Sequence, residues 1–141
     1  MEMGGKEERI LVVDDDPQLR ALLVEMLATR GAHVAQVGGA VEALDHVRNM
    51  TVDLVITDIV MPGMDGHSLI TALKQEVPWV KVVAVTGGYR GLWAARLGDL
   101  AQQCGADRVL LKPFLQEDLM RAVVELLSPV VEDSPPDAPG G

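Results

Sequence analysis

Short apolar runs rich in β-branched residues alternate five times along this chain with longer stretches of helical spacing. The apolar runs, which we expect to be strands, are 10–13, 33–37, 54–57, 81–85 and 108–111. The first helical stretch lies between Asp16 and Gly31, and the later ones are 40–49, 66–76, 92–103 and 116–127. Strands joined in this way by helices run parallel and place the helices on both faces of one sheet. The sequence therefore predicts a doubly wound α/β fold with a five-stranded parallel sheet.

The first helical stretch has clear signals at both ends. Asp16 is a suitable N-cap, Pro17 suits the first turn, and Gly31 is a suitable stop. Apolar residues recur between them at i, i+3, i+4, i+7 and i+8, namely Leu19, Leu22, Leu23, Met26 and Leu27. This spacing predicts an amphipathic helix.

The length of 141 residues fits one domain, which we place at 9–127. Residues 128–141 hold four of the eight prolines and three acids without a base, so we expect a disordered tail, and 1–8 a flexible N-terminus. The formal charge of −9 disfavours binding of nucleic acid through a broad basic surface. The sequence shows neither a signal peptide nor an apolar stretch of membrane-spanning length, and it has one cysteine. We therefore expect a cytoplasmic protein without membrane insertion.

Polar residues stand where the expected strands end. The first strand is followed by Asp14 and Asp15, the third by Asp58, the fourth by Thr86 and the fifth by Lys112. In such sheets the polar chemistry gathers outside the carboxyl ends of the strands, so these side chains should meet. Two carboxylates about 5 Å apart repel by roughly 3 kcal/mol at an effective dielectric constant near 20. A hard divalent cation with oxygen ligands offsets that repulsion, and Mg²⁺ suits a partly hydrated site with few carboxylates.

Carboxylates beside Mg²⁺, a lysine and a hydroxyl indicate phosphoryl transfer. Asp58 would be the nucleophile, and as an ionised carboxylate it would need no general base. The metal and the Lys112 ammonium would balance charge on the phosphoryl oxygens. Thr86 would donate its hydroxyl and Gly87 its backbone amide.

Four segments in this order resemble the receiver domains of two-component response regulators. They are 10–17 (ILVVDDDP), 53–66 (DLVITDIVMPGMDG), 82–88 (VVAVTGG) and 110–114 (LLKPF). The resemblance implies a flavodoxin-like (βα)5 fold with Asp58 as the phosphoacceptor. It also implies that Asp15 binds Mg²⁺ directly, Asp14 through water and Val60 through its backbone carbonyl. A cis peptide bond before Pro113 and a phosphohistidine donor, on a kinase or a phosphotransfer protein, are implied as well.

The chain departs from the family pattern at two places. Receivers often carry an aromatic switch residue three positions before the lysine, where this chain has Val109. The segment between Thr86 and Lys112 is also longer than in the shortest receivers, and it contains the glycine-rich run 87–91 with Tyr89. We hypothesise that this run reports phosphorylation in place of the aromatic. Gly88 and Val60 stand where the family tunes access of water, so the lifetime of the phosphate stays open.

Other side chains are expected to pack. We assign structural or exposed roles to His33, His46 and His67 because they lack the spacing of metal ligands. Two apolar sets come from the last two helices and the strand between them. Trp93, Leu97, Leu100 and Cys104 are expected to be mostly core, whereas Val109, Met120, Val124 and Leu127 would form a strip beyond the core stripe Leu119, Val123 and Leu126. Packing is the default for that strip, and a partner or dimer face is the alternative.

We therefore predict a stand-alone response regulator that signals through an unknown protein partner or a relay, with a homodimer kept open. It would be a phosphoacceptor and not a conventional enzyme, with self-phosphorylation from small donors and self-dephosphorylation kept open. One alternative is a degenerate receiver that acts as a binding scaffold independently of phosphorylation. Another is a Mg²⁺-dependent phosphatase with an aspartyl intermediate, which is disfavoured because no substrate cap is visible.

Overall fold

The computed structural model describes residues 7–60, 66–87 and 92–128, with the side chains of 92–95 left out. Strands and helices alternate along the chain as the sequence predicts. The strands are β1 (Arg9–Val13), β2 (His33–Val37), β3 (Leu54–Asp58), β4 (Lys81–Thr86) and β5 (Arg108–Leu111). The helices are α1 (Pro17–Ala28), α2 (Ala40–Asn49), α3 (Gly66–Glu76), α4 (Leu92–Cys104) and α5 (Gln116–Leu127). β3, β4 and α4 each extend one residue beyond the predicted end.

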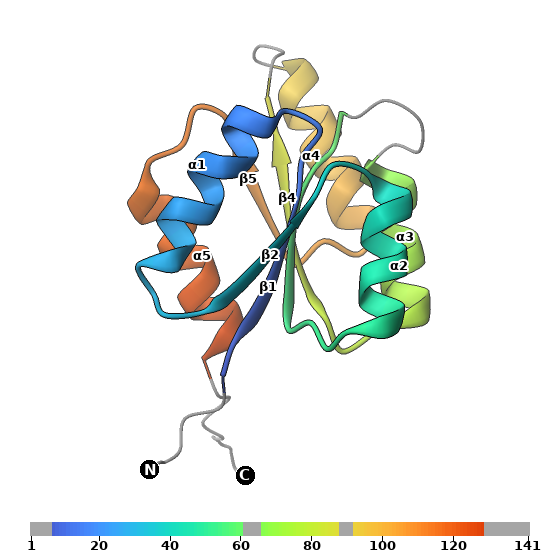
Figure 1. Cartoon of the computed structure of the whole chain (residues 1–141). Helices are drawn as coiled ribbons and strands as arrows, with labels where there is room; N and C mark the ends of the chain where they lie inside the picture. Colours follow the sequence, from blue (N-terminus) through green and yellow to red (C-terminus); the bar gives the residue numbers. More distant parts are fainter. Residues whose placement is uncertain (1–6, 61–65, 88–91, 129–141) are drawn as a thin grey trace, which may run out of the picture.

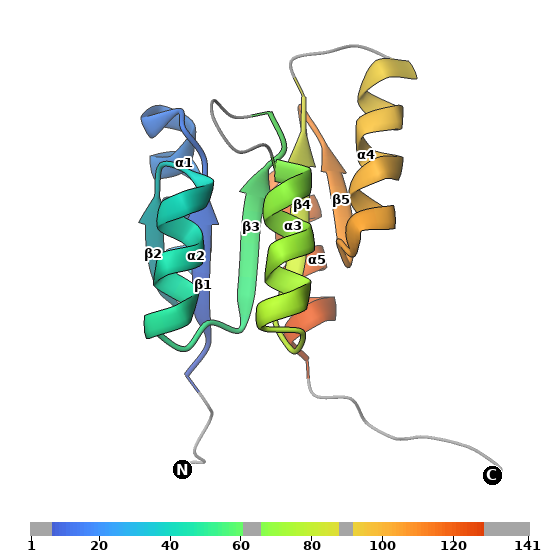
Figure 2. The ribbon, with the colours of Figure 1, turned by 90° about the vertical axis from the view of Figure 1, so that its right-hand side faces the viewer.

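All five strands form one parallel sheet in the order β2-β1-β3-β4-β5. Helices α1 and α5 cover one face, and α2, α3 and α4 cover the other (Figures 1 and 2). Because side chains alternate along a strand, β1 sends Leu11 and Val13 to one core and Ile10 and Val12 to the other. The predicted doubly wound, flavodoxin-like α/β fold is confirmed.

Helix α1 begins as its sequence predicts. The Asp16 side chain accepts hydrogen bonds from the amides of Gln18 (3.0 Å) and Leu19 (3.4 Å), and Pro17 occupies the first turn. Gly31 adopts a left-handed backbone with φ of 82° just after the helix. The predicted apolar stripe is wider than the face that the sheet covers, since Leu22 keeps 46% of its surface exposed.

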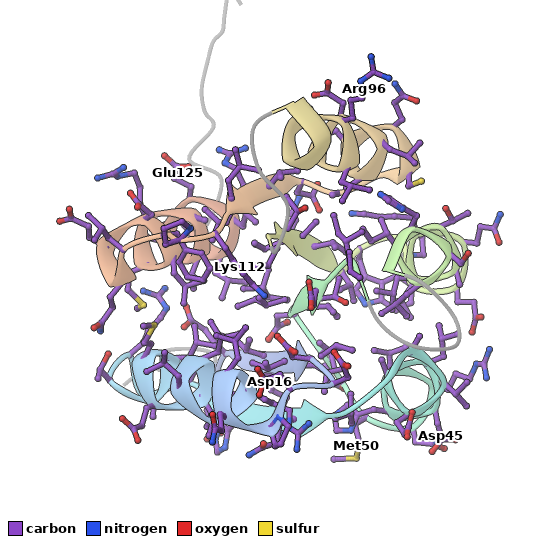
Figure 3. The ribbon with its side chains drawn as sticks, turned by 90° about the horizontal axis from the view of Figure 1, so that it is seen from above. Asp16, Asp45, Met50, Arg96, Lys112 and Glu125 are labelled. Atoms are coloured by element: carbon purple, nitrogen blue, oxygen red, sulfur yellow. The ribbon has the colours of Figure 1, made fainter. Side chains whose placement is uncertain are left out.

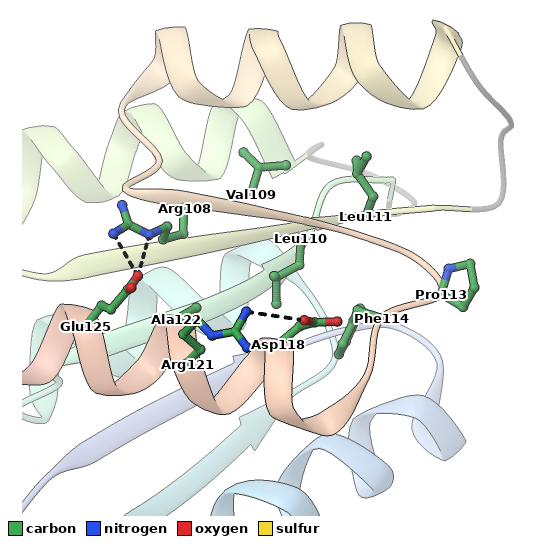
Figure 4. A pocket seen from close by; sticks show the side chains of 10 residues that line it. All are labelled: Arg108, Val109, Leu110, Leu111, Pro113, Phe114, Asp118, Arg121, Ala122 and Glu125. Atoms are coloured by element: carbon green, nitrogen blue, oxygen red, sulfur yellow. Dashed lines mark hydrogen bonds and ion pairs between the residues drawn. The ribbon is translucent and has the colours of Figure 1, made fainter.

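Two predictions about the last helices need correction. Among the α4 residues whose side chains the structure describes, 96–104, the buried positions are Gly98 and Ala101. Leu100 is 44% exposed and is not core, and the Trp93 side chain lies outside the described part of the chain. The strip that we expected to join Val109 to α5 does not exist as one surface. Val109 and Leu111 point toward α4 while Leu110 points toward α5 (Figure 4). The reason is strand alternation, which places Val109 on the opposite face of the sheet from α5.

The N-terminal contacts begin before the predicted boundary at residue 9. Arg30 forms a two-point ion pair with Glu8, with both N–O distances 2.7 Å, and His33 pairs with Glu7. Within the part of the chain that the structure describes, no helix is both long and apolar enough to cross a membrane.

Candidate functional site

Four strands bring their polar ends to one edge of the sheet, as predicted. Asp14 and Asp15 follow β1, Asp58 and Thr86 are the last residues of β3 and β4, and Lys112 follows β5. The neighbouring strands are in parallel register, with Asp58 opposite Val85 of β4. Figure 3 looks down on this edge, where the Lys112 side chain points inward between the helices.

Three carboxylates cluster at this edge. One oxygen from each of Asp14, Asp15 and Asp58 lies within 4.8 Å of the others. Asp14 is 2% exposed, Asp58 has a side chain that is 11% exposed, and Asp15 is open to solvent. Three carboxylates at this spacing repel one another and form an all-oxygen donor set with one open side, which suits Mg²⁺ with part of its hydration shell retained.

The loop that carries Asp14 is held tightly. The Asp14 amide donates to the Val37 carbonyl at 3.2 Å, and the Asp14 carboxylate accepts from the Asp16 amide at 2.9 Å. Burial raises the pKa of the Asp14 carboxyl above its ordinary value, while the Asp16 amide and the Lys112 ammonium oppose that rise. The ionised form of the buried Asp14 carboxylate is therefore unfavourable unless a metal cation binds beside it.

Asp58 has a similar environment with a cation nearby. Burial raises the pKa of its carboxyl, and the negative charge of Asp14 adds to this rise. The Lys112 Nζ lies 3.9 Å from Asp58 Oδ2 and opposes it, as do hydrogen bonds from the amides of Ile59 and Val60. Among the described residues, the Lys112 ammonium thus faces three clustered carboxylates, whose negative charge it cannot balance by itself.

Thr86, Gly87 and Lys112 complete the edge on its other side. The Thr86 Oγ1 is buried and has no hydrogen-bond partner among the described residues. The Lys112 side chain passes directly over Gly87, where a Cβ would lie 2.6 Å from Lys112 Cδ. The Lys112 amide donates to the Thr86 carbonyl at 2.8 Å, and the bond between Lys112 and Pro113 is cis, as the resemblance implied.

The sequence-predicted site residues thus lie at one edge of the sheet, with Val60 two residues after the end of β3. Gly88 and Tyr89, on which the reporter hypothesis rests, lie outside the described residues. His67 has the structural role that we predicted, because its Nε2 donates to the Leu97 carbonyl of α4 at 3.1 Å.

Two residues near the site were not singled out from the sequence as site residues. Gly66 packs on the β3 end so closely that a Cβ would lie 2.6 Å from the Asp58 carbonyl oxygen. Arg20 donates from Nη1 to the Asp14 carbonyl at 2.8 Å. A buried glycine at a helix start and an arginine six positions after an aspartate carry no distinctive sequence signal, because both roles depend on packing.

A hollow outside this acidic edge lies between β5 and α5 (Figure 4). Its charged side chains are paired with one another, Arg108 with Glu125 at 2.9 Å and Arg121 with Asp118 at 3.7 Å. It holds no cluster of three potential metal ligands among the described residues.

The comparisons with known proteins agree with this geometry. Residues 10–124 match the response regulator receiver domain family. The chain is 35% identical over 123 residues to the DNA-binding response regulator MtrA of Mycolicibacterium smegmatis, which covers 86% of this chain and 51% of MtrA. It is also 35% identical over 131 residues to the response regulator MprA of a Mycobacterium species, covering 93% of this chain and 55% of MprA.

The chain therefore spans about half the length of these curated relatives. Among solved structures, it superposes on a CheY-like response regulator receiver domain protein from Methanospirillum hungatei with a TM-score of 0.76 and 30% identity. That match covers 85% of this chain and 93% of the other. This chain belongs to the response regulator receiver domain family.

Proposed function

We propose that this receiver domain accepts a phosphoryl group on Asp58, in a Mg²⁺-dependent reaction, from a phosphohistidine of a kinase or a phosphotransfer protein. The observation that carries the proposal is the setting of the Asp58 carboxylate. It is largely buried, it lies 3.9 Å from the Lys112 ammonium, and it shares its edge of the sheet with two further carboxylates.

The chain's own residues divide the work. Asp14, Asp15 and Asp58, with the backbone carbonyl of Val60, would hold Mg²⁺. Bound Mg²⁺ would neutralise negative charge on the phosphoryl oxygens. Lys112 would hold a further oxygen of the phosphoryl group by its positive charge.

The transfer exchanges one bond to phosphorus for another. A carboxylate oxygen of Asp58 forms the new bond, while the bond from phosphorus to the histidine nitrogen breaks and its electron pair stays on the imidazole. The Thr86 hydroxyl is buried without a partner among the described residues, so it is free to donate to a phosphoryl oxygen. The Gly87 amide would donate to another.

Signalling would then follow through protein–protein contacts in the cytoplasm. The phosphorylated edge would change the affinity of the domain for an output protein or pass its phosphoryl group to a relay partner. The domain itself would not need to contact nucleic acid for either route.

The test is intact mass spectrometry after incubation with Mg²⁺ and acetyl phosphate, a small phosphoryl donor. We expect one phosphoryl increment that disappears in Asp58→Ala and in the presence of EDTA. Asp99→Ala is the matched control because Asp99 is an exposed aspartate on α4 that does not belong to the acidic cluster. An increment that survives Asp58→Ala would refute Asp58 as the acceptor. If the wild-type protein shows neither an increment nor Mg²⁺ binding, a scaffold role independent of phosphorylation replaces the proposal.

A further inference from the structure

Arg20 of α1 connects three elements next to the acidic cluster. Its Nη1 donates to the Asp14 backbone carbonyl at 2.8 Å, and its Nε donates to the Gln36 Oε1 of β2 at 2.9 Å. The guanidinium therefore ties α1 and β2 to the loop that follows β1. A Cβ on Gly38 would lie 3.4 Å from Nη1, so the loop after β2 passes close to the same group.

The contact acts on the backbone of Asp14 and leaves its carboxylate available. The Asp14 carboxylate already accepts from the Asp16 amide, and the Asp14 amide donates to the Val37 carbonyl. Together with Arg20, these bonds engage the amide, the carbonyl and the side chain of one residue. Asp14 is 2% exposed, so water cannot readily replace the bond from Arg20.

We propose that Arg20, held in place by Gln36, is a positioning residue that sets the orientation of Asp14 and thereby the Mg²⁺ affinity of the site. This inference rests on the proposed function, because it assumes that the acidic cluster binds Mg²⁺. Groups that orient metal ligands typically change metal affinity by about tenfold to a hundredfold when they are removed.

The two possible effects of Arg20, positioning of Asp14 and repulsion by its positive charge, predict opposite changes in Mg²⁺ affinity when Arg20 is replaced. Arg20 is a cation beside a cation site, so its charge alone disfavours Mg²⁺. Arg20→Met removes this repulsion, and by charge alone it would tighten Mg²⁺ binding. If the hydrogen bonds matter more than the charge, the same variant binds Mg²⁺ more weakly.

The experiment measures Mg²⁺ affinity by titration of amide NMR shifts in the wild-type chain and four variants. Arg20→Met removes charge and hydrogen bonds, Arg20→Lys keeps the charge but loses the planar two-point fork, and Gln36→Met removes only the uncharged partner. Arg30→Met is the matched control. Arg30 is a partly buried arginine just before β2, and it pairs with Glu8 just before β1, at the opposite end of the sheet from the acidic cluster.

We expect about tenfold weaker binding for Arg20→Met, a smaller loss for Arg20→Lys and for Gln36→Met, and no change for Arg30→Met. Phosphorylation of Arg20→Met by acetyl phosphate should need more Mg²⁺ but approach the wild-type rate at saturation, which a general loss of structure would not produce. The melting temperature of each variant identifies any that do not fold.

Wild-type or tighter Mg²⁺ affinity in Arg20→Met would overturn the inference, as would wild-type affinity in Arg20→Lys. If Arg20→Met does not fold, Gln36→Met decides, and unchanged affinity there overturns the inference. These results leave the proposed function intact. An absence of Mg²⁺ binding by the wild-type chain removes both the metal site and the role of Arg20.

Discussion

Replacing Asp14 by asparagine should stabilise the metal-free protein. Asp14 is 2% exposed and has a carboxylate oxygen within 4.8 Å of one on Asp58 and one on Asp15. Asparagine has nearly the same shape, and its Oδ1 can still accept the 2.9 Å hydrogen bond from the Asp16 amide. The substitution therefore removes a charge with little change in packing.

The magnitude follows from Coulomb's law. At a separation of 4.8 Å, the upper limit for these carboxylate oxygens, and an effective dielectric constant of about 20, Asp14 and Asp58 repel by roughly 3 kcal/mol. The loss of attraction between Asp14 and Lys112 returns part of this energy, whereas relief of the buried charge adds to the gain. We expect a net gain of about 1–2 kcal/mol in the free energy of unfolding, which raises the melting temperature by about 4–8 °C for a domain of this size.

The pH dependence has a defined sign. The folded state raises the pKa of Asp14 above its ordinary value of 3.8, so the folded state binds the proton more tightly than the unfolded state does. The loss of stability caused by the ionised Asp14 carboxylate is absent well below pH 3.8, grows as the pH rises from there through the folded-state pKa, and is complete above that pKa. The advantage of Asp14→Asn should thus be largest at pH 7 and shrink toward pH 4.

Thermal melts followed by circular dichroism, with and without Mg²⁺, test this reasoning. Mg²⁺ should raise the melting temperature of the wild-type chain more than that of Asp14→Asn, because the variant has lost one ligand charge. Asp99→Asn is the control, since Asp99 is exposed on α4 and should show no comparable gain. A metal-free Asp14→Asn protein that melts at or below the wild-type temperature at pH 7 would refute the repulsion argument.

Two further predictions concern stability alone. Leu119→Ala should lower the free energy of unfolding, measured with denaturant, by about 2–5 kcal/mol because Leu119 is fully buried. Leu115→Ala, at a position 62% exposed, should change it little, and equal losses would contradict the packing described for α5. Gly31→Ala should lower the free energy of unfolding by about 1 kcal/mol because the φ of Gly31 is 82°, although there is open space for a Cβ. Gly31→Asn should lower it less, and an unchanged melting temperature for both variants would show that the left-handed turn relaxes without penalty.

Local patterns were sufficient to predict each helix and strand that the structure describes, but not the exact strand ends. The apolar run ends at Thr57, yet β3 continues through Asp58 because Asp58 still pairs with Val85 of β4. Likewise, helical spacing marks Leu22 and Leu100 as apolar-face residues, and both are more than 40% exposed. Periodicity reports which face of a helix is apolar, while the width of the neighbouring layer decides how much of that face is covered.

The proposed Mg²⁺ and phosphoryl site was similarly predictable in its residue types. Asp14, Asp58 and Lys112 were found from the sequence because parallel strands joined by helices bring their carboxyl ends to one edge. The face on which Val109 lies was not inferred correctly, because the joint strip required knowledge of where α5 packs.

The sequence alone determined the order of elements and the identity of the polar residues at the strand ends, since both depend on short-range periodicity. Only the tertiary structure decided that Asp14 is buried, that Gly66 must approach the Asp58 carbonyl, and that Arg20 reaches from α1 to the Asp14 backbone. The physical reason is that desolvation and hydrogen bonding act over a few ångströms. Those separations are set by strand order and helix packing between residues distant in the chain, which no local pattern encodes.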